Sequence, residues 1–148
     1  MKKRYWILVG FLLVTLMLYA ENDSQIDVLT SLFSKALPEG FELDDSGMDK
    51  ENVYVVFKKG AQEIIAVNWQ KDYQIEFDDV DSFEHQGRKM IFYYAGFKKN
   101  GGLVVFLQND AGYLVLGHTK PYMGEAIVKK EELISIIEKI DFGKIEKD

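Results

Sequence analysis

The stretch that decides the fold is residues 90–116, where three short apolar blocks alternate with glycine-containing breaks. The blocks read Met-Ile-Phe-Tyr-Tyr at 90–94, Leu-Val-Val-Phe-Leu at 103–107 and Tyr-Leu-Val-Leu at 113–116. β-Branched and aromatic residues favour strands, and the breaks at 98–102 and 109–112 contain Gly and Asn, which accept the positive φ that tight turns need. The pattern therefore predicts three consecutive antiparallel strands.

Alternating apolar residues on the N-terminal side of this stretch predict further strands. Residues 53–58 and 63–69 flank Gly60 as in a hairpin, and residues 73–77 form another alternating run. A first strand is expected at 41–43, followed by a polar loop at 44–47. The acidic segment 78–84 is expected to cross to the strand at 90–94. These runs together predict an antiparallel meander of about seven strands.

Two helices are expected to flank the strands. Apolar residues recur at three- and four-residue spacing at 25–36 and again at 129–140. Pro38 is expected to end the first helix, and Gly143 to cap the second. This order is typical of an α+β fold with both helices on one face of the sheet. The sequence leaves open whether the sheet is an open curved sheet or a half-barrel.

The first twenty residues have the form of an export signal. Three basic residues at 2–4 precede an apolar run at 5–19, and Ala20 provides a small residue ahead of a polar segment. We expect a signal peptide at 1–20; an uncleaved anchor is the alternative, because the run approaches the ~20 residues that span a bilayer. Residues 21–148 are then one extracytoplasmic domain, and the absence of cysteine is ordinary in a bacterial envelope.

The composition argues against nucleic acid as a partner. The chain has 24 acidic and 18 basic residues and a net charge of −6, so phosphate backbones would repel it at long range. Beyond the export segment, no basic cluster exceeds the pairs at 58–59, 98–99 and 129–130. No cofactor is expected, because the sequence has no phosphate-binding loop and no metal-ligand motif.

Few residues in this sequence are candidates for a catalytic role. His85 and His118 are the only possible neutral-pH bases, and no serine lies in the strained, glycine-flanked turn typical of a nucleophile. The weak candidates for metal ligands are Asp78, Asp79, Asp81, Glu84 and His85. Their spacing does not match a calcium-binding EF-hand loop. A hydrolytic or metal-dependent enzyme would need one histidine to meet at least two of these carboxylates, and we expect a non-enzymatic protein instead.

The aromatic residues indicate a binding surface. Rings occur on successive predicted strands, and two short helices cannot cover both faces of a seven-stranded sheet. The candidate ligand- or partner-binding residues are Trp69, Tyr73, Tyr93 and Tyr113. The alternative is that these rings belong to the core. Tyr93 and Tyr94 are adjacent in a predicted strand, so their side chains must point to opposite faces.

The sequence also resembles a family of bacterial extracytoplasmic domains found after the transmembrane helix of anti-sigma-factor-like proteins. The resemblance lies in Leu-Pro-Glu-Gly-Phe at 37–41, Gly87, Gly-Tyr-Leu-Val at 112–115, and Glu-Lys-Ile-Asp at 138–141. It implies a distant likeness to half-barrel envelope proteins that carry lipoproteins or sense envelope stress.

The sequence and the resemblance together predict an exported, non-enzymatic module. We expect it to bind a protein partner or a lipid-like ligand on the sheet face that the helices leave open. A purely structural envelope protein is the alternative.

Overall fold

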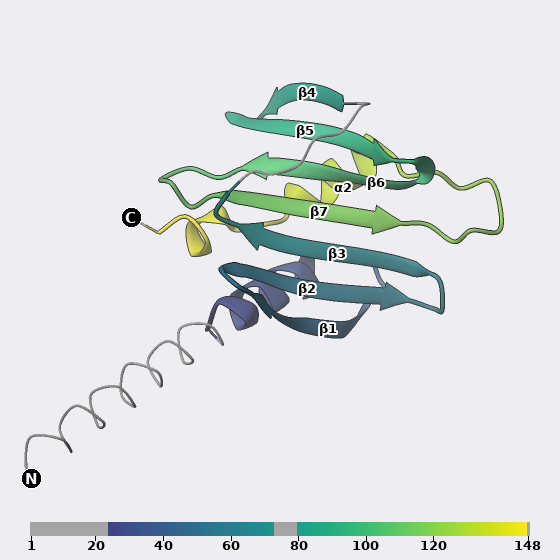
Figure 1. Ribbon diagram of the computed structural model, residues 1–148, viewed down its shortest axis with the longest axis horizontal. Helices are drawn as coiled ribbons and strands as arrows, with labels where there is room; N and C mark the ends of the chain where they lie inside the picture. The colour runs from purple at the N-terminus through teal and green to yellow at the C-terminus, as the bar shows by residue number, and fades with distance from the viewer. Residues whose placement is uncertain (1–23, 73–79, 148) are drawn as a thin grey trace, which may run out of the picture.

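A computed structural model describes residues 24–72 and 80–147. Within these residues, seven strands form one antiparallel sheet in the order β1-β2-β3-β7-β6-β5-β4 (Figure 1). The strands are β1 (Glu42–Asp49), β2 (Asn52–Lys59), β3 (Glu63–Gln70), β4 (Val80–His85), β5 (Arg88–Ala95), β6 (Phe97–Phe106) and β7 (Tyr113–Thr119). The sheet is curved and does not close, so β1 and β4 are its edges. The expected signal segment at 1–20 and the expected strand at 73–77 lie outside the described residues.

Two helices cover one face of the sheet, which is the far face in Figure 1. The N-terminal helix spans residues 24–36, and α2 spans Lys130–Ile137. Alternate residues of the strands point to this face and pack against both helices. The largest fully buried side chains there are Phe33, Phe57, Leu29, Ile65, Met90, Leu103, Leu114, Leu116, Leu133 and Ile137. This arrangement of helices on one face of an antiparallel sheet confirms the α+β fold. Burial of each of these side chains contributes about 1.5–3 kcal/mol to folding.

The glycines at 101 and 102 lie inside β6, so the prediction of a turn at 98–102 was wrong. The turn is at Gly96, which has a φ of 80°. Gly102 pairs with Tyr93 of β5, and a Cβ at Gly102 would collide with the Tyr93 ring and hydroxyl. These glycines therefore allow close packing of an aromatic ring and do not mark a turn.

The predicted polar loop at 44–47 was also wrong, because β1 continues through it to Asp49. The strand pairs with β2 throughout, with a register shift between Leu43 and Asp45. Asp44 forms an ion pair of 2.7 Å with Lys58. Polar residues fit here because an edge strand has one side open to solvent.

Strand β4 lies where the sequence predicted a crossing segment. Phe83 packs against the main core from this strand. Its neighbours on the same face are polar, and they contact α2 instead: Asp81 Oδ2 lies 2.6 Å from Lys130 Nζ, and His85 Nε2 lies 3.0 Å from Glu138 Oε1. The strand was missed because ion pairs replace the apolar alternation that identifies a strand.

The C-terminal segment consists of α2 and a short turn that follows it. Helix α2 ends at Ile137, earlier than expected, and its cap is Glu138. Gly143 does not cap it: the Gly143 amide donates to Asp141 Oδ1 at 3.2 Å within a short 3-10 turn, η1 (Phe142–Lys144). Among the described helices, none is long and apolar enough to cross a bilayer.

Candidate functional site

The two histidines are held by carboxylates outside the acidic segment 78–84. His85 pairs with Glu138 of the α2 cap, and His118 Nε2 lies 2.9 Å from Glu63 Oε1 of β3. Asp81 is paired with Lys130, Glu84 is exposed on β4, and Asp78 and Asp79 lie outside the described residues. Within residues 24–72 and 80–147, no group of three or more His, Asp or Glu side chains could hold a metal ion. The described part of the chain therefore lacks the convergence that the enzyme hypothesis requires.

The predicted aromatic site is divided between the two faces of the sheet. Trp69 lies on the helix-covered face, where its Nε1 donates to the Ala111 carbonyl at 2.7 Å. Tyr93 and Tyr113 lie on the opposite face in a small apolar cluster that includes Val104. Tyr93 is only 7% exposed. Tyr73 lies outside the described residues, so the structure brings together only Tyr93 and Tyr113.

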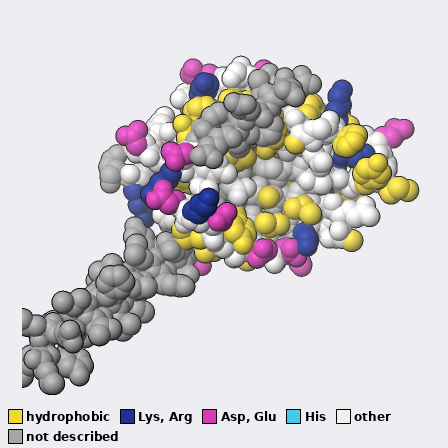
Figure 2. Space-filling view, in the orientation of Figure 1, with side chains coloured by type: hydrophobic (Ala, Val, Ile, Leu, Met, Phe, Trp, Pro, Cys, Tyr) yellow, Lys and Arg dark blue, Asp and Glu magenta, His cyan; other side chains and the backbone are white. Residues whose placement is uncertain are grey.

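Exposed apolar side chains gather instead at one end of the sheet. Figure 2 shows them at the right-hand end, where Figure 1 places the connection from β7 to α2. Phe97 is 71% exposed, and Tyr122 and Met123 are each 80% exposed. Ile127 is also exposed, so among the described residues only Leu43 is a large exposed hydrophobic residue elsewhere.

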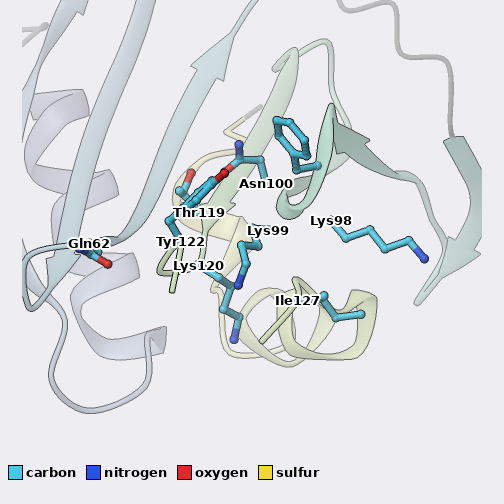
Figure 3. Close-up of a pocket in the computed structure, with 9 residues that line it drawn as sticks. Gln62, Lys98, Lys99, Asn100, Thr119, Lys120, Tyr122 and Ile127 are labelled. Atoms are coloured by element: carbon cyan, nitrogen blue, oxygen red, sulfur yellow. The ribbon is translucent and has the colours of Figure 1, made fainter. Parts of the chain in front are cut away.

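Phe97, Tyr122 and Ile127 border a hollow of about 900 Å³, which we call the end hollow. It is lined by Gln62, Phe97, Lys98, Lys99, Asn100, Thr119, Lys120, Tyr122 and Ile127 (Figure 3). Its walls come from the start of β6, the end of β7, the β2–β3 hairpin and the connection to α2. Segments distant in sequence therefore build it.

Lys99 fixes the wall formed by residues 121–126. Its ammonium group donates to the carbonyl oxygens of Pro121, Gly124 and Ala126 at 3.0, 2.7 and 3.2 Å. An ammonium group has three N–H donors, so all of them are used. The Tyr94 hydroxyl also donates to the Val128 carbonyl at 2.9 Å. The connection has no regular secondary structure, yet its backbone is held at several points.

A polar network that includes the lining residue Lys120 borders the hollow. Glu63 Oε1 accepts a hydrogen bond from His118 and lies 4.0 Å from Lys120 Nζ, which is 3.0 Å from Glu132 Oε2. His118 is 5% exposed, and burial lowers its pKa, although the hydrogen bond to Glu63 opposes this shift. With Nε2–H donated to Glu63, the buried Nδ1 has no hydrogen-bond partner among the described residues. Burial therefore favours the neutral form of the His118 imidazole.

The end hollow was not predicted from the sequence. The lysines at 98 and 99 were predicted to lie in a turn, whereas they lie in β6. The available signal was Tyr122-Met123, two large apolar residues between a proline and a glycine, where a solvated loop normally has polar residues.

Comparison of the chain with protein-family models, curated proteins and solved structures finds no match. The resemblance to extracytoplasmic domains therefore stays a prediction.

Proposed function

We propose that this protein is an exported, non-catalytic envelope module that binds a protein partner or an apolar ligand in the end hollow. The observation that carries the proposal is the gathering of the exposed side chains Phe97, Tyr122 and Ile127 around one concavity. Contiguous exposed apolar patches are rare on soluble monomers unless they serve an interaction. The volume of about 900 Å³ falls in the range of small-molecule sites, roughly 300–1,000 Å³.

The position of this site differs from the open sheet face that the sequence predicts. Tyr93 on that face is largely buried, whereas Phe97 and Tyr122 are mostly exposed. Large, freely exposed rings supply contact area when a partner covers them. The end of the sheet is therefore the better supported binding surface.

The hydrogen bonds of Lys99 support the same proposal. A wall that is already ordered loses little conformational entropy when a ligand binds. The three carbonyl contacts hold Tyr122 and Met123 on a fixed backbone, although their side chains face solvent. An apolar surface presented in this way is suited to recognition.

The test is native mass spectrometry of the protein isolated from the cells that make it. We expect wild type to carry a bound small molecule or protein that the double variant Phe97→Ser/Tyr122→Ser loses. The matched control is Leu43→Ser, which removes an exposed apolar residue from β1. Bare protein for all three chains, or the same adduct on all three, would overturn the proposal, and a bare wild type would favour the structural alternative. The mass also reports cleavage after Ala20.

A further inference from the structure

We propose that the occupant of the end hollow is an anionic amphiphile, a molecule with one apolar chain and one acidic headgroup. This inference rests on the proposed function, because it names the ligand of the same site. It follows from the charges that line the hollow, from the place where those charges lie, and from the net charge of the whole chain.

The lining of the end hollow is basic in an acidic protein. Three of its residues are lysines and none is a carboxylate, although the chain has 24 acidic and 18 basic residues. Lys120 is balanced by Glu63 and Glu132. Lys99 contacts only neutral carbonyl groups, and Lys98 has no ion pair among the described residues. Two positive charges thus lie beside an apolar surface without a carboxylate partner within residues 24–72 and 80–147.

Lys98 marks the position for an acidic headgroup. Its side chain also borders a second hollow of about 460 Å³, which is lined by the lysines Lys129 and Lys130 and by the carboxylates Asp81 and Glu131. Figure 3 shows Lys98 extending away from Lys99 and Lys120. A headgroup at Lys98 would leave the apolar chain of the ligand in the end hollow. Because Lys130 is paired with Asp81, Lys98 and Lys129 are the remaining cations of this hollow, and they outnumber its remaining carboxylate, Glu131.

The apolar part of the ligand has its own surface. Phe97, Tyr122 and Ile127 line the end hollow, with Asn100 and Thr119 as the polar groups between them. Concave sites of this kind bind the apolar part by burial and orient the ligand through a few polar groups. Exposed aromatic rings beside unbalanced lysines fit an amphiphile better than a fully polar anion.

Net charge favours a single molecule over an anionic membrane surface. Charges in solution are screened beyond about 8 Å at physiological ionic strength, so a small ligand in the hollow interacts mainly with the nearby lysines. A bilayer would face a much larger part of the domain, whose chain has a net charge of −6. The lysines can therefore attract a monomeric anion even though the protein as a whole is acidic.

The test uses three amphiphiles with the same twelve-carbon chain, each kept below its micelle-forming concentration and titrated calorimetrically into the full protein. The anionic probe is dodecanoate, the neutral one is dodecyl maltoside and the cationic one is dodecyltrimethylammonium. We expect dodecanoate to bind about tenfold more tightly than the neutral probe, and the cationic probe to bind most weakly.

Two pairs of variants locate the interaction. Lys98→Glu should weaken dodecanoate binding about tenfold and leave the neutral probe unaffected, whereas Lys139→Glu, which reverses another exposed lysine, should change neither. Phe97→Ser/Tyr122→Ser should abolish binding of all probes, and Leu43→Ser should not. Circular dichroism spectra that match wild type show that each variant is folded.

The outcomes separate this inference from the proposed function. Equal binding of anionic and neutral probes, with no effect of Lys98→Glu, would overturn the acidic headgroup and leave the apolar site standing. No binding of any probe, with a protein adduct that Phe97→Ser/Tyr122→Ser removes, would overturn the amphiphile in favour of a protein partner. Sedimentation with phosphatidylglycerol vesicles, without binding of monomeric dodecanoate, would overturn it in favour of a membrane surface.

Discussion

The ring of Tyr93 lies against the Cα of Gly102, its partner across the β5–β6 ladder, so closely that no Cβ fits between them. The carbonyl oxygen of Leu116 would also lie 2.8 Å from such a Cβ. On the other side, Gly102 pairs with Gly117 of β7, where the nearest atom to an added Cβ would be the Ala66 carbonyl oxygen at 3.7 Å. Two neighbouring glycines therefore have very different surroundings.

We expect Gly102→Ala to lower the free energy of unfolding by about 2–3 kcal/mol, the upper part of the range for overpacking, because both a ring and the backbone must move. Gly117→Ala is the matched control. It should leave stability unchanged or raise it by up to about 1 kcal/mol, because alanine loses less backbone entropy than glycine. Urea unfolding of the two variants measures the difference, and equal effects would show that the Tyr93 contact is not the cause.

Replacement of Lys99 should loosen the wall of the end hollow. Lys99→Met keeps much of the aliphatic stem but removes three hydrogen bonds to carbonyl oxygens, and bonds to charged groups contribute about 1.5–3 kcal/mol each. We expect amide hydrogen exchange in residues 122–128 to accelerate by at least about tenfold, with little change in β2 and β3. Lys98→Met is the control, since the Lys98 ammonium group makes no such bonds to any part of the chain that the structure describes. Faster exchange throughout the sheet would instead indicate global destabilisation.

The buried His118 should make stability depend on pH. Burial holds its folded pKa below the usual 6.5, so the unfolded chain binds a proton first as the pH falls. The stability from neutral His118 is complete above pH 6.5 and is lost as the pH falls below that value. The charged or titratable groups that face it are Glu63, Lys120 and Glu132.

The measurement is the free energy of unfolding of wild type and His118→Gln between pH 8 and pH 5. Glutamine keeps an N–H donor for Glu63 but does not titrate in this range. We expect the wild-type stability to fall relative to that of the variant below about pH 6.5, with a slope no steeper than about 1.4 kcal/mol per pH unit. Parallel curves would exclude His118 as the origin of the pH dependence.

The parts of the fold that the sequence predicted are those with an apolar pattern. The strands at 53–58, 63–69, 90–94, 103–107 and 113–116 all occur. The alternation in the first two reflects burial on the helix-covered face, and the continuous apolar runs in the other three reflect burial on both faces. The edge strands were harder to predict. Strand β1 has an open edge that tolerates Asp44 and Asp45, and β4 contacts α2 through Asp81 and His85, so neither shows the pattern by which strands are identified.

Long-range polar contacts were beyond prediction for a different reason. The Arg88 guanidinium and the Glu146 carboxylate form a bidentate ion pair between β5 and the C-terminal segment, and the centroid of the Phe142 ring lies 4.0 Å from the Arg88 Cζ. Sequence spacing contains no information about such a contact. The end hollow could not be predicted from the sequence for the same reason, because the segments that form its walls come together only after β6 and β7 pair. Local patterns predict elements, whereas sites depend on how these elements meet.

The open sheet has a consequence for the behaviour of the protein at high concentration. The free backbone N–H and C=O groups of an edge strand can pair with a strand of another molecule, and such pairing leads to aggregation. Exposed carboxylates lie along both edges: Asp45 and Asp49 on β1, and Glu84 on β4. When two copies approach edge to edge, these like charges come together, and their electrostatic repulsion disfavours strand pairing between molecules.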